Sequence, residues 1–128
     1  MYLLEHDAKQ LLAARGIAVP AGCLIGRDGT IHRAALPPGP WMVKAQIPAG
    51  GRGKAGLIRK AATLQEVSDH TGALLGTTFK GHVVESVRVE QQVPSSREIY
   101  IGCMLDPAAG GVRVMLSASG RMDLEQAP

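Results

Sequence analysis

The spacing of apolar positions predicts two helices in the first 75 residues of the chain. Over residues 4–14, apolar side chains recur at helical intervals and form one stripe, and Gly16 follows as a natural stop. The second helix is expected over residues 63–75. Thr63 and Glu66 have the spacing of a capping box, in which each side chain satisfies a backbone N–H of the first turn. The start of this helix is therefore the best-defined boundary in the sequence.

Alternation of apolar and polar positions predicts strands in the rest of the chain. Residues 41–47 place Val43 on one face and Lys44 on the other. Residues 87–93 alternate valines with polar side chains, and residues 99–116 have the pattern of an antiparallel hairpin with a Gly-rich turn. The last third of the chain is therefore expected to form antiparallel sheet, whereas the proline-rich stretch before residue 41 is expected to be a loop.

Length and charge limit the kinds of partner that the chain can have. The 128 residues suit about one domain, and 45% of them are hydrophobic. Lys and Arg number 14 against 11 Asp and Glu, a mild excess that suits small anionic ligands. The one dense basic cluster, residues 51–60, has no interleaved aromatic residues, which argues against a nucleic-acid binder. That alternative would require strongly salt-dependent binding of DNA or RNA.

Cysteine usage and the N-terminal sequence predict a cytoplasmic protein. Cys23 and Cys103 lie far apart, without the spacing of a zinc site, so we expect free thiols in a reducing compartment. The first seven residues include acidic side chains where a signal peptide would be basic, and no apolar run is long enough to cross a bilayer. We therefore expect no membrane association.

The strongest chemical signal is a strand lysine that is followed directly by a glycine loop. Lys44 precedes residues 48–56, which contain four glycines together with Arg52 and Lys54. Glycine lets the backbone approach an anion and expose its N–H groups, and the cations add formal charge. The pattern is neither a Walker A loop nor a dinucleotide fingerprint. It predicts phosphate binding, with a mobile solvated loop as the alternative.

A second and weaker signal lies after the strand at residues 87–93. Glu90 and Glu98 could accept hydrogen bonds from an amine or from ribose hydroxyls, and the backbone between them could meet the edge of a base. Taken alone, strand carboxylates are more often solvated than ligand-binding. The four histidines form neither a triad nor a metal-binding spacing, so no catalytic or metal-ligating residue is predicted.

Four segments, taken in order, resemble the β subunit of the ADP-forming succinyl-CoA synthetases. They are residues 5–12, the strand and loop of residues 39–56, the pair at 89–90 and the run at 98–102. The Ala-Gly-Gly-Arg-Gly-Lys-Ala-Gly run within the loop is the most specific of these. The matches cover nearly the whole chain.

The resemblance implies an α+β (α/β) protein with the ATP-grasp fold, in which a nucleotide lies between two subdomains. The whole chain, residues 1–128, would be the N-terminal part of that domain, with a mixed or antiparallel sheet and flanking helices. Residues 20–94 would form the first nucleotide-binding subdomain. Residues 1–19 and 95–128 would begin the second.

The resemblance also implies a set of nucleotide-binding residues. Lys44 would contact the phosphates beneath a covering loop at residues 51–53. Glu90 and the backbone around Val93 would meet the base, and Glu98 would approach the ribose. The positions carried over from the family pattern are Lys44, Gly51, Arg52, Gly53, Glu90, Val93 and Glu98.

The family's reaction couples ATP and a dicarboxylic acid to CoA and gives an acyl-CoA, ADP and phosphate. It passes through a phosphohistidine that a partner α subunit carries, and none of the histidines in this chain matches that residue. ATP or GTP would bind with Mg²⁺, whose ligands are expected beyond the position that matches Pro128. The 128-residue chain is therefore not expected to complete the reaction alone. Malate–CoA ligase is a related family with a similar pattern.

One departure from the family pattern lies near the end of the chain. Residues 117–121 read Ser-Ala-Ser-Gly-Arg where the family usually has Ser-Thr-Glu-Gly-Gly. The changes at Ser119 and Arg121 remove an acid and introduce a cation. They motivate an alternative hypothesis, in which the chain is a degenerate, non-catalytic ATP-grasp module that docks a partner subunit.

Overall fold

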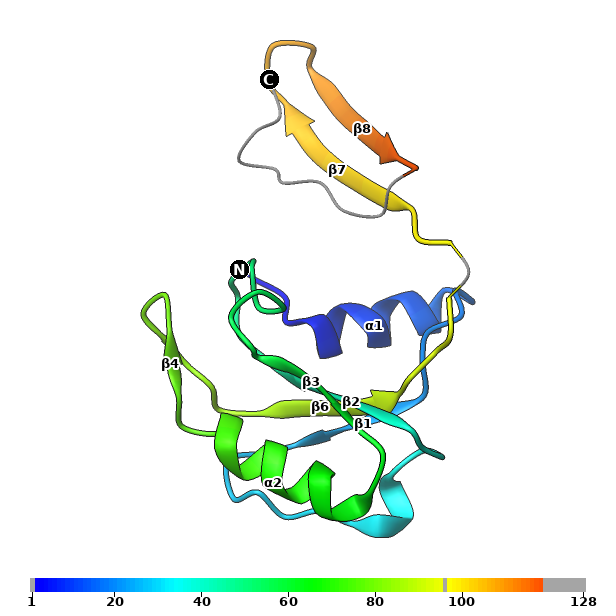
Figure 1. Cartoon of the computed structure of the whole chain (residues 1–128). Coiled ribbons are helices and arrows are strands. Elements are labelled where there is room, and N and C mark those ends of the chain that lie inside the picture. The colour runs from blue at the N-terminus through cyan, green and yellow to red at the C-terminus, as the bar shows by residue number, and fades with distance from the viewer. Residues whose placement is uncertain (1, 96, 119–128) are drawn as a thin grey trace. The chain divides into compact units, whose positions relative to one another are not determined.

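The computed structural model describes residues 2–95 and 97–118 of the 128-residue chain. The chain divides into two compact units, Met1–Val93 and Pro94–Pro128 (Figure 1). Each unit is described by itself below. Within the described residues, no helix is both long and apolar enough to cross a membrane.

A four-stranded antiparallel sheet forms the centre of the first unit. Its strands follow the order β1-β6-β2-β3. The strands predicted at residues 41–47 and 87–93 are confirmed, and they lie side by side in this sheet rather than joining the hairpin that follows. The strand bounds are Gly22–Ile25 for β1, Trp41–Ala45 for β2, Ile58–Ala61 for β3 and Val87–Gln91 for β6.

Helix α2, Leu64–Leu74, covers one face of this sheet (Figure 1). The predicted capping box is present, because Thr63 accepts from the N–H of Glu66 and the Glu66 carboxylate accepts from the N–H of Thr63. The helix buries Val67 and Leu74 completely against the sheet, where Val43 is also fully buried. The core of the unit therefore lies between α2 and the sheet.

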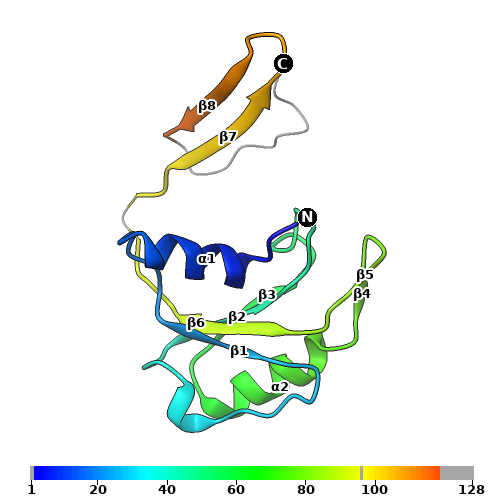
Figure 2. The same ribbon diagram turned by 180° about the vertical axis from the view of Figure 1, so that it is seen from behind.

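Helix α1, Glu5–Ala14, lies on the opposite face of the sheet (Figure 2). The helix confirms the prediction for residues 4–14, and Gly16 follows it with a φ of 77°. None of its residues is buried, and its apolar stripe faces outward, with Leu11 57% and Leu12 43% exposed. Glu5 and Lys9 contact the sheet instead. The orientation of α1 is therefore set by charge and not by apolar packing.

Several short elements had no counterpart in the sequence pattern. Strand β1 was not predicted, and β4 (Thr78–Phe79) and β5 (His82–Val83) form a small hairpin of their own. The expected loop before β2 contains one 3-10 turn, η1, Arg33–Ala35. Two to four residues are too few for an alternating pattern to stand out.

The second unit contains the predicted hairpin. Strands β7 (Tyr100–Asp106) and β8 (Gly111–Ser117) pair antiparallel, and Asp106 lies opposite Gly111. The Asp106 carboxylate accepts from backbone N–H groups of the turn and from Arg113 at 2.6 Å. The assignment of residues 1–19 and 95–128 to one subdomain stays a prediction.

Candidate functional site

Lys44 lies on the face of β2 that α1 covers. It sits opposite Arg88 in the β2–β6 register, so both cations belong to one patch of the sheet. Its Nζ lies 3.0 Å from Oε1 of Glu5 and also contacts the Glu90 carboxylate. The Lys44 side chain is 17% exposed to solvent. The lysine predicted from the sequence is therefore held between two carboxylates and remains partly accessible.

The carboxylate of Glu90 is buried beneath α1. It accepts from Nζ of Lys9 at 2.6 and 2.9 Å, from Nε of Arg88 at 2.7 Å and from Lys44. Glu90 is only 2% exposed, so the interpretation of this carboxylate as a solvated strand residue is wrong. A buried carboxylate is costly unless cations and hydrogen bonds compensate it, and three cations do so here.

Arg52 fixes the glycine loop to the end of β2. Its Nη1 donates to the backbone oxygen of Ala45 at 2.7 Å, and its Nη2 donates to Oε2 of Glu5 at 2.6 Å. The loop closes on itself through backbone bonds, among them Leu57 N–H to the Arg52 oxygen at 2.9 Å. Gly51 has a φ of 83°, a conformation that favours glycine. The loop is therefore folded around Arg52.

Glu5 joins the loop cation to the strand cation. Its Oε1 contacts Lys9 at 2.7 Å and Lys44 at 3.0 Å, while its Oε2 contacts Arg52 at 2.6 Å. Burial raises the pKa of this carboxyl, but the hydrogen bonds and charges of Lys9 and Lys44 outweigh that effect and hold the pKa at about 2. Glu5 is therefore fully ionised at neutral pH.

These contacts define an ionic cluster that carries more positive than negative charge. Burial opposes the charged form of both Lys44 and Glu90, yet mutual pairing raises the pKa of Lys44 and lowers that of Glu90. Among the described residues, four cations face two carboxylates, which leaves two positive charges in excess. The members of the ionic cluster are Glu5, Lys9, Lys44, Arg52, Arg88 and Glu90.

His6 lies at the edge of the ionic cluster. Its Nδ1 is 2.8 Å from Nη1 of Arg88, and its backbone N–H donates to Oε1 of Gln46 at 2.8 Å. Burial and the Arg88 charge both lower the pKa of His6, so the imidazole is favoured in its neutral form. This histidine therefore has a structural position beside the cations.

The structure brings together part of the predicted site. Lys44, Arg52 and Glu90 share the ionic cluster, and Gly51 and Gly53 lie exposed in the loop beside it. The remaining two predicted residues are the 57% exposed Val93, after β6, and the exposed Glu98, in the second unit. Ser119 and Arg121, at which this chain departs from the family pattern, lie outside the described residues.

Sequence reasoning missed three members of the ionic cluster: Glu5, Lys9 and Arg88. Two local signals could have pointed to them. Glu5 and Lys9 have the spacing of an ion pair along one helix face. Arg88 stands between two valines of a strand whose residues from Val87 to Glu90 are all buried, and a cation in such a position needs a partner.

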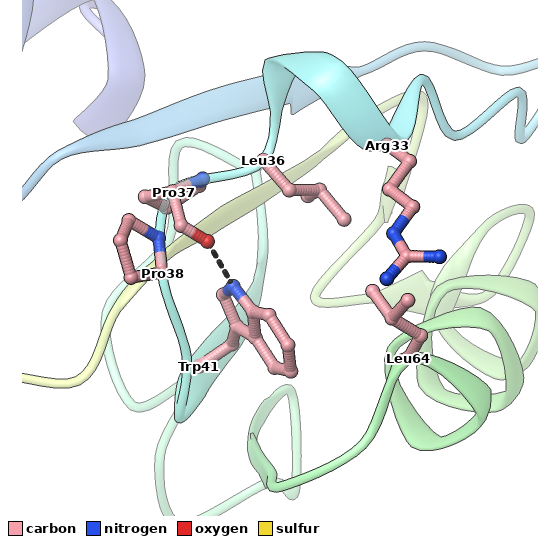
Figure 3. A pocket seen from close by; sticks show the side chains of 6 residues that line it. All are labelled: Arg33, Leu36, Pro37, Pro38, Trp41 and Leu64. Carbon is pink, nitrogen blue, oxygen red and sulfur yellow. Dashed lines mark hydrogen bonds between the residues drawn. The ribbon is translucent and has the colours of Figure 1, made fainter.

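A separate hollow of about 300 Å³ lies beside the proline-rich segment before β2 (Figure 3). In its lining, the indole Nε1 of Trp41 donates to the backbone oxygen of Pro37 at 2.7 Å. Arg33 is the one charged residue in its lining, and none of the lining residues belongs to the ionic cluster. They are Arg33, Leu36, Pro37, Pro38, Trp41 and Leu64.

Metal ligation finds no support in the described part of the chain. There, no group of three or more His, Cys, Asp or Glu side chains could hold a metal ion. Cys23 and Cys103 are both free thiols.

The ionic cluster and the loop beside it suit an anionic ligand. The loop and strand cations converge on Glu5, and exposed glycines lie next to them.

Comparison with known proteins shows which proteins the chain is similar to. The succinate–CoA ligase [ADP-forming] subunit beta of Alkalilimnicola ehrlichii is 41% identical over 98% of this chain and 34% of its own length. For subunit beta 2 of the same name from Archaeoglobus fulgidus, the identity is 38%, over 98% of this chain and 33% of that protein. The succinate–CoA ligase [GDP-forming] subunit beta of Thermus thermophilus is 40% identical over 98% of this chain and 34% of its own length.

The chain therefore spans about a third of the length of these relatives. A family model described as the ATP-grasp domain matches residues 2–127, nearly the full sequence. The fold of the first unit, with an antiparallel sheet between two helices, agrees with that match. This chain belongs to the ATP-grasp domain family.

Proposed function

We propose that the chain supplies part of the nucleotide site of an ADP-forming acid–CoA ligase, with Lys44 and Arg52 as the phosphate-binding cations. One observation carries the proposal. The two cations come from different segments, a strand and a glycine loop, and converge on the same carboxylate of Glu5. Two cations that share one carboxylate are also placed to share the oxygens of a phosphate.

The surroundings of Lys44 support this role. Its side chain is 17% exposed, and its ammonium contacts Glu90, which is itself fixed by Lys9 and Arg88. A cation held in this way does not have to be ordered when the ligand arrives, which lowers the entropic cost of binding. Gly51 and Gly53 would let the phosphates approach the exposed loop backbone. We assign the base to the neighbourhood of Glu90 and Val93 and the ribose to Glu98.

The activity of the whole protein forms part of the proposal. The relatives are named as ligases of succinate and CoA, and this chain would contribute to the same reaction: ATP or GTP, a dicarboxylic acid and CoA giving acyl-CoA, nucleoside diphosphate and phosphate. The α subunit would be its partner. Relatives with ADP and GDP in their names are 41% and 40% identical to this chain, so overall identity does not decide the base.

The ionic cluster does not offer a site for Mg²⁺. Glu5 and Glu90 are its two carboxylates among the described residues, and cations already hold both of them. Magnesium prefers carboxylates and water in octahedral geometry. The residues present therefore do not fit the metal, and its ligands would come from outside the described part of the chain.

Calorimetric titration of the 128-residue chain with Mg-ATP and with Mg-GTP tests this proposal. We expect saturable binding of at least one nucleotide. Lys44→Met should weaken it about ten- to a hundredfold, the loss expected for one charged contact. Lys60→Met is the matched control, because Lys60 is an exposed lysine on β3, the strand that pairs with β2. Equal affinity of the wild type and Lys44→Met would contradict the assignment.

The docking-module alternative has a different signature. A stable complex with an α subunit that forms equally well with and without nucleotide would favour it. Its motivation was the departure at residues 117–121, of which Ser119 and Arg121 lie outside the described residues. The described ionic cluster instead favours the nucleotide site.

A further inference from the structure

We infer that Glu5 is an internal competitor of the ligand's phosphate, and that its carboxylate must leave Lys44 or Arg52 when a polyphosphate binds. The inference rests on the proposed function, since it concerns the same two cations. It adds a residue of α1 to the determinants of nucleotide affinity. Glu5 would set how tightly the site holds its ligand without contacting the ligand in the bound state.

The geometry of the carboxylate is that of a bound phosphate group. Oε1 of Glu5 lies 3.0 Å from Nζ of Lys44, and Oε2 lies 2.6 Å from Nη2 of Arg52. Each oxygen therefore meets a different cation. Phosphate oxygens bind lysine and arginine through the same short, charge-assisted hydrogen bonds. A polyphosphate that uses both cations would have to occupy the place that Glu5 now takes.

Of the two carboxylates in the ionic cluster, Glu5 is the one that can be displaced. Its side chain is 19% exposed, whereas that of Glu90 is 3% exposed and bonded to Lys9, Arg88 and Lys44. Burial of a carboxylate stripped of partners is costly, so exposure decides which of the two moves. Glu5 can turn toward solvent, and Glu90 cannot.

Helix α1 does not have to leave the sheet for Glu5 to move. Lys9 holds the helix to Glu90, the His6 N–H donates to Gln46, and the His6 ring contacts Arg88. Lys9 also contacts Oε1 of Glu5 at 2.7 Å, but its contacts with Glu90 and those of His6 do not require the Glu5 carboxylate. A change of the Glu5 side-chain rotamer is therefore enough to open the site.

Charge gives the sign of the effect. Removing the Glu5 charge raises the positive excess around Lys44 and Arg52 and also removes the need to break two contacts before the ligand binds. Glu5→Gln should therefore bind polyphosphate more tightly, on the order of tenfold, which corresponds to one charge-assisted hydrogen bond. A purely structural role of Glu5 would predict the opposite sign, because losing the carboxylate would then loosen the loop.

The test is a calorimetric titration of three proteins with inorganic tripolyphosphate and with Mg-ATP: wild type, Glu5→Gln and Asp7→Asn. Asp7 lies on the same first turn, is exposed, and loses the same charge in its variant. We expect the higher affinity in Glu5→Gln and near-wild-type affinity in Asp7→Asn. Equal affinities in all three proteins, weaker binding in Glu5→Gln, or no polyphosphate binding in any of them would overturn the inference.

The two ligands separate this inference from the proposed function. If Glu5→Gln tightens tripolyphosphate but Mg-ATP binds no better than tripolyphosphate, the inference stands and the nucleotide site fails. If Mg-ATP binding depends on Lys44 but Glu5→Gln behaves like Asp7→Asn, the function stands and the inference fails. Should Glu5→Gln not fold, the ¹³C shift of the wild-type Glu5 carboxyl provides a second measurement. Saturating tripolyphosphate should change it, and an unchanged shift in the bound protein would overturn the inference.

Discussion

Nζ of Lys9 on α1 lies 2.6 Å from Oε2 and 2.9 Å from Oε1 of Glu90 on β6. The two residues are 81 positions apart in the sequence, and their contact joins the first helix of the chain to the middle of the sheet. Since α1 has no buried residue, this pair and the contacts of Glu5 and His6 attach the helix.

Lys9→Met should loosen α1 from the sheet. Glu90 would keep its contacts with Lys44 and Arg88. We therefore expect the free energy of unfolding to fall by about 1–3 kcal/mol, which is less than the loss for a buried carboxylate without any partner. Urea unfolding measures this loss, and hydrogen exchange should show faster opening of the α1 amides. Gln10→Met, at the next and exposed position, should change neither. Unaltered α1 exchange in Lys9→Met would contradict an ionic attachment.

Gly22→Ala should destabilise the first unit through a steric clash. A Cβ at Gly22 would lie 2.7 Å from Cβ of Glu90 and 2.8 Å from the backbone oxygen of Val89, so β1 and β6 would have to separate. Overpacking of this kind costs about 1–3 kcal/mol. Gly50→Ala is the control, because a Cβ there meets nothing within 4 Å. Urea midpoints of the two variants should differ clearly, and equal midpoints would show that β1 adapts without cost.

Stability should fall in acid because of the carboxylates in the ionic cluster. The pKa of Glu5 is about 2 in the folded protein against an ordinary value of 4.5, and that of Glu90 is lowered as well. Between those values the unfolded chain binds more protons, so the stabilisation present above pH 4.5 is lost as the pH falls toward 2. For Glu5 the loss is on the order of 3 kcal/mol.

Urea unfolding between pH 2 and pH 7 checks this expectation. Glu5→Gln should flatten the acid limb of the profile, and Asp7→Asn should leave it steep. The lowered pKa of His6 contributes stability that is present above pH 6.5 and lost below it, and this part of the profile should be common to the wild type and Glu5→Gln. Asp7→Asn should enlarge it, because the Asp7 charge raises the pKa of His6. An acid limb that is equally steep in Glu5→Gln would argue against strong pairing of this carboxylate.

Thr63→Ala should cost about 1 kcal/mol of stability, the usual value for a lost N-cap. The Thr63 hydroxyl accepts from the Glu66 N–H at 3.2 Å, and alanine leaves that donor to water. Ser68→Ala, at an exposed position in the middle of α2, should be neutral or slightly stabilising because alanine is the better helix former. Thermal unfolding compares the two variants, and a smaller loss in Thr63→Ala than in Ser68→Ala would contradict the capping role.

Local signals explain which parts of the fold the sequence predicts. Thr63 and Glu66 mark the start of α2, and Gly76 marks its end. These signals lie in or next to the helix, so its bounds can be predicted from the local sequence. The alternation in β2 and β6 likewise predicts which side chains face the core, among them Val43, Val87 and Val89. Strand β1 has only four residues, too few for an alternating pattern to stand out. Its first residue is Gly22, because a side chain there would clash with β6, and this requirement is not visible in the sequence.

The orientation of α1 could not be read in the same way. Its apolar stripe indicates a helix, yet the charged face is the one that contacts the sheet, because the partners of Glu5 and Lys9 come from strands and a loop far along the chain. Lys44 and Arg52 could be found from the glycine loop beside them. The burial of Glu90 could not be found in this way, because it depends on cations from two other elements, Lys9 of α1 and Lys44 of β2.

Trp41 is the single tryptophan of the sequence, and it begins the strand that carries Lys44. Its indole is partly buried and donates to the Pro37 oxygen (Figure 3). None of the residues that line the neighbouring hollow belongs to the ionic cluster. Fluorescence excited selectively in tryptophan, and not in Tyr2 or Tyr100, therefore comes from this one residue. Because Trp41 lies on β2, its emission spectrum offers a label-free optical record of whether this strand stays folded.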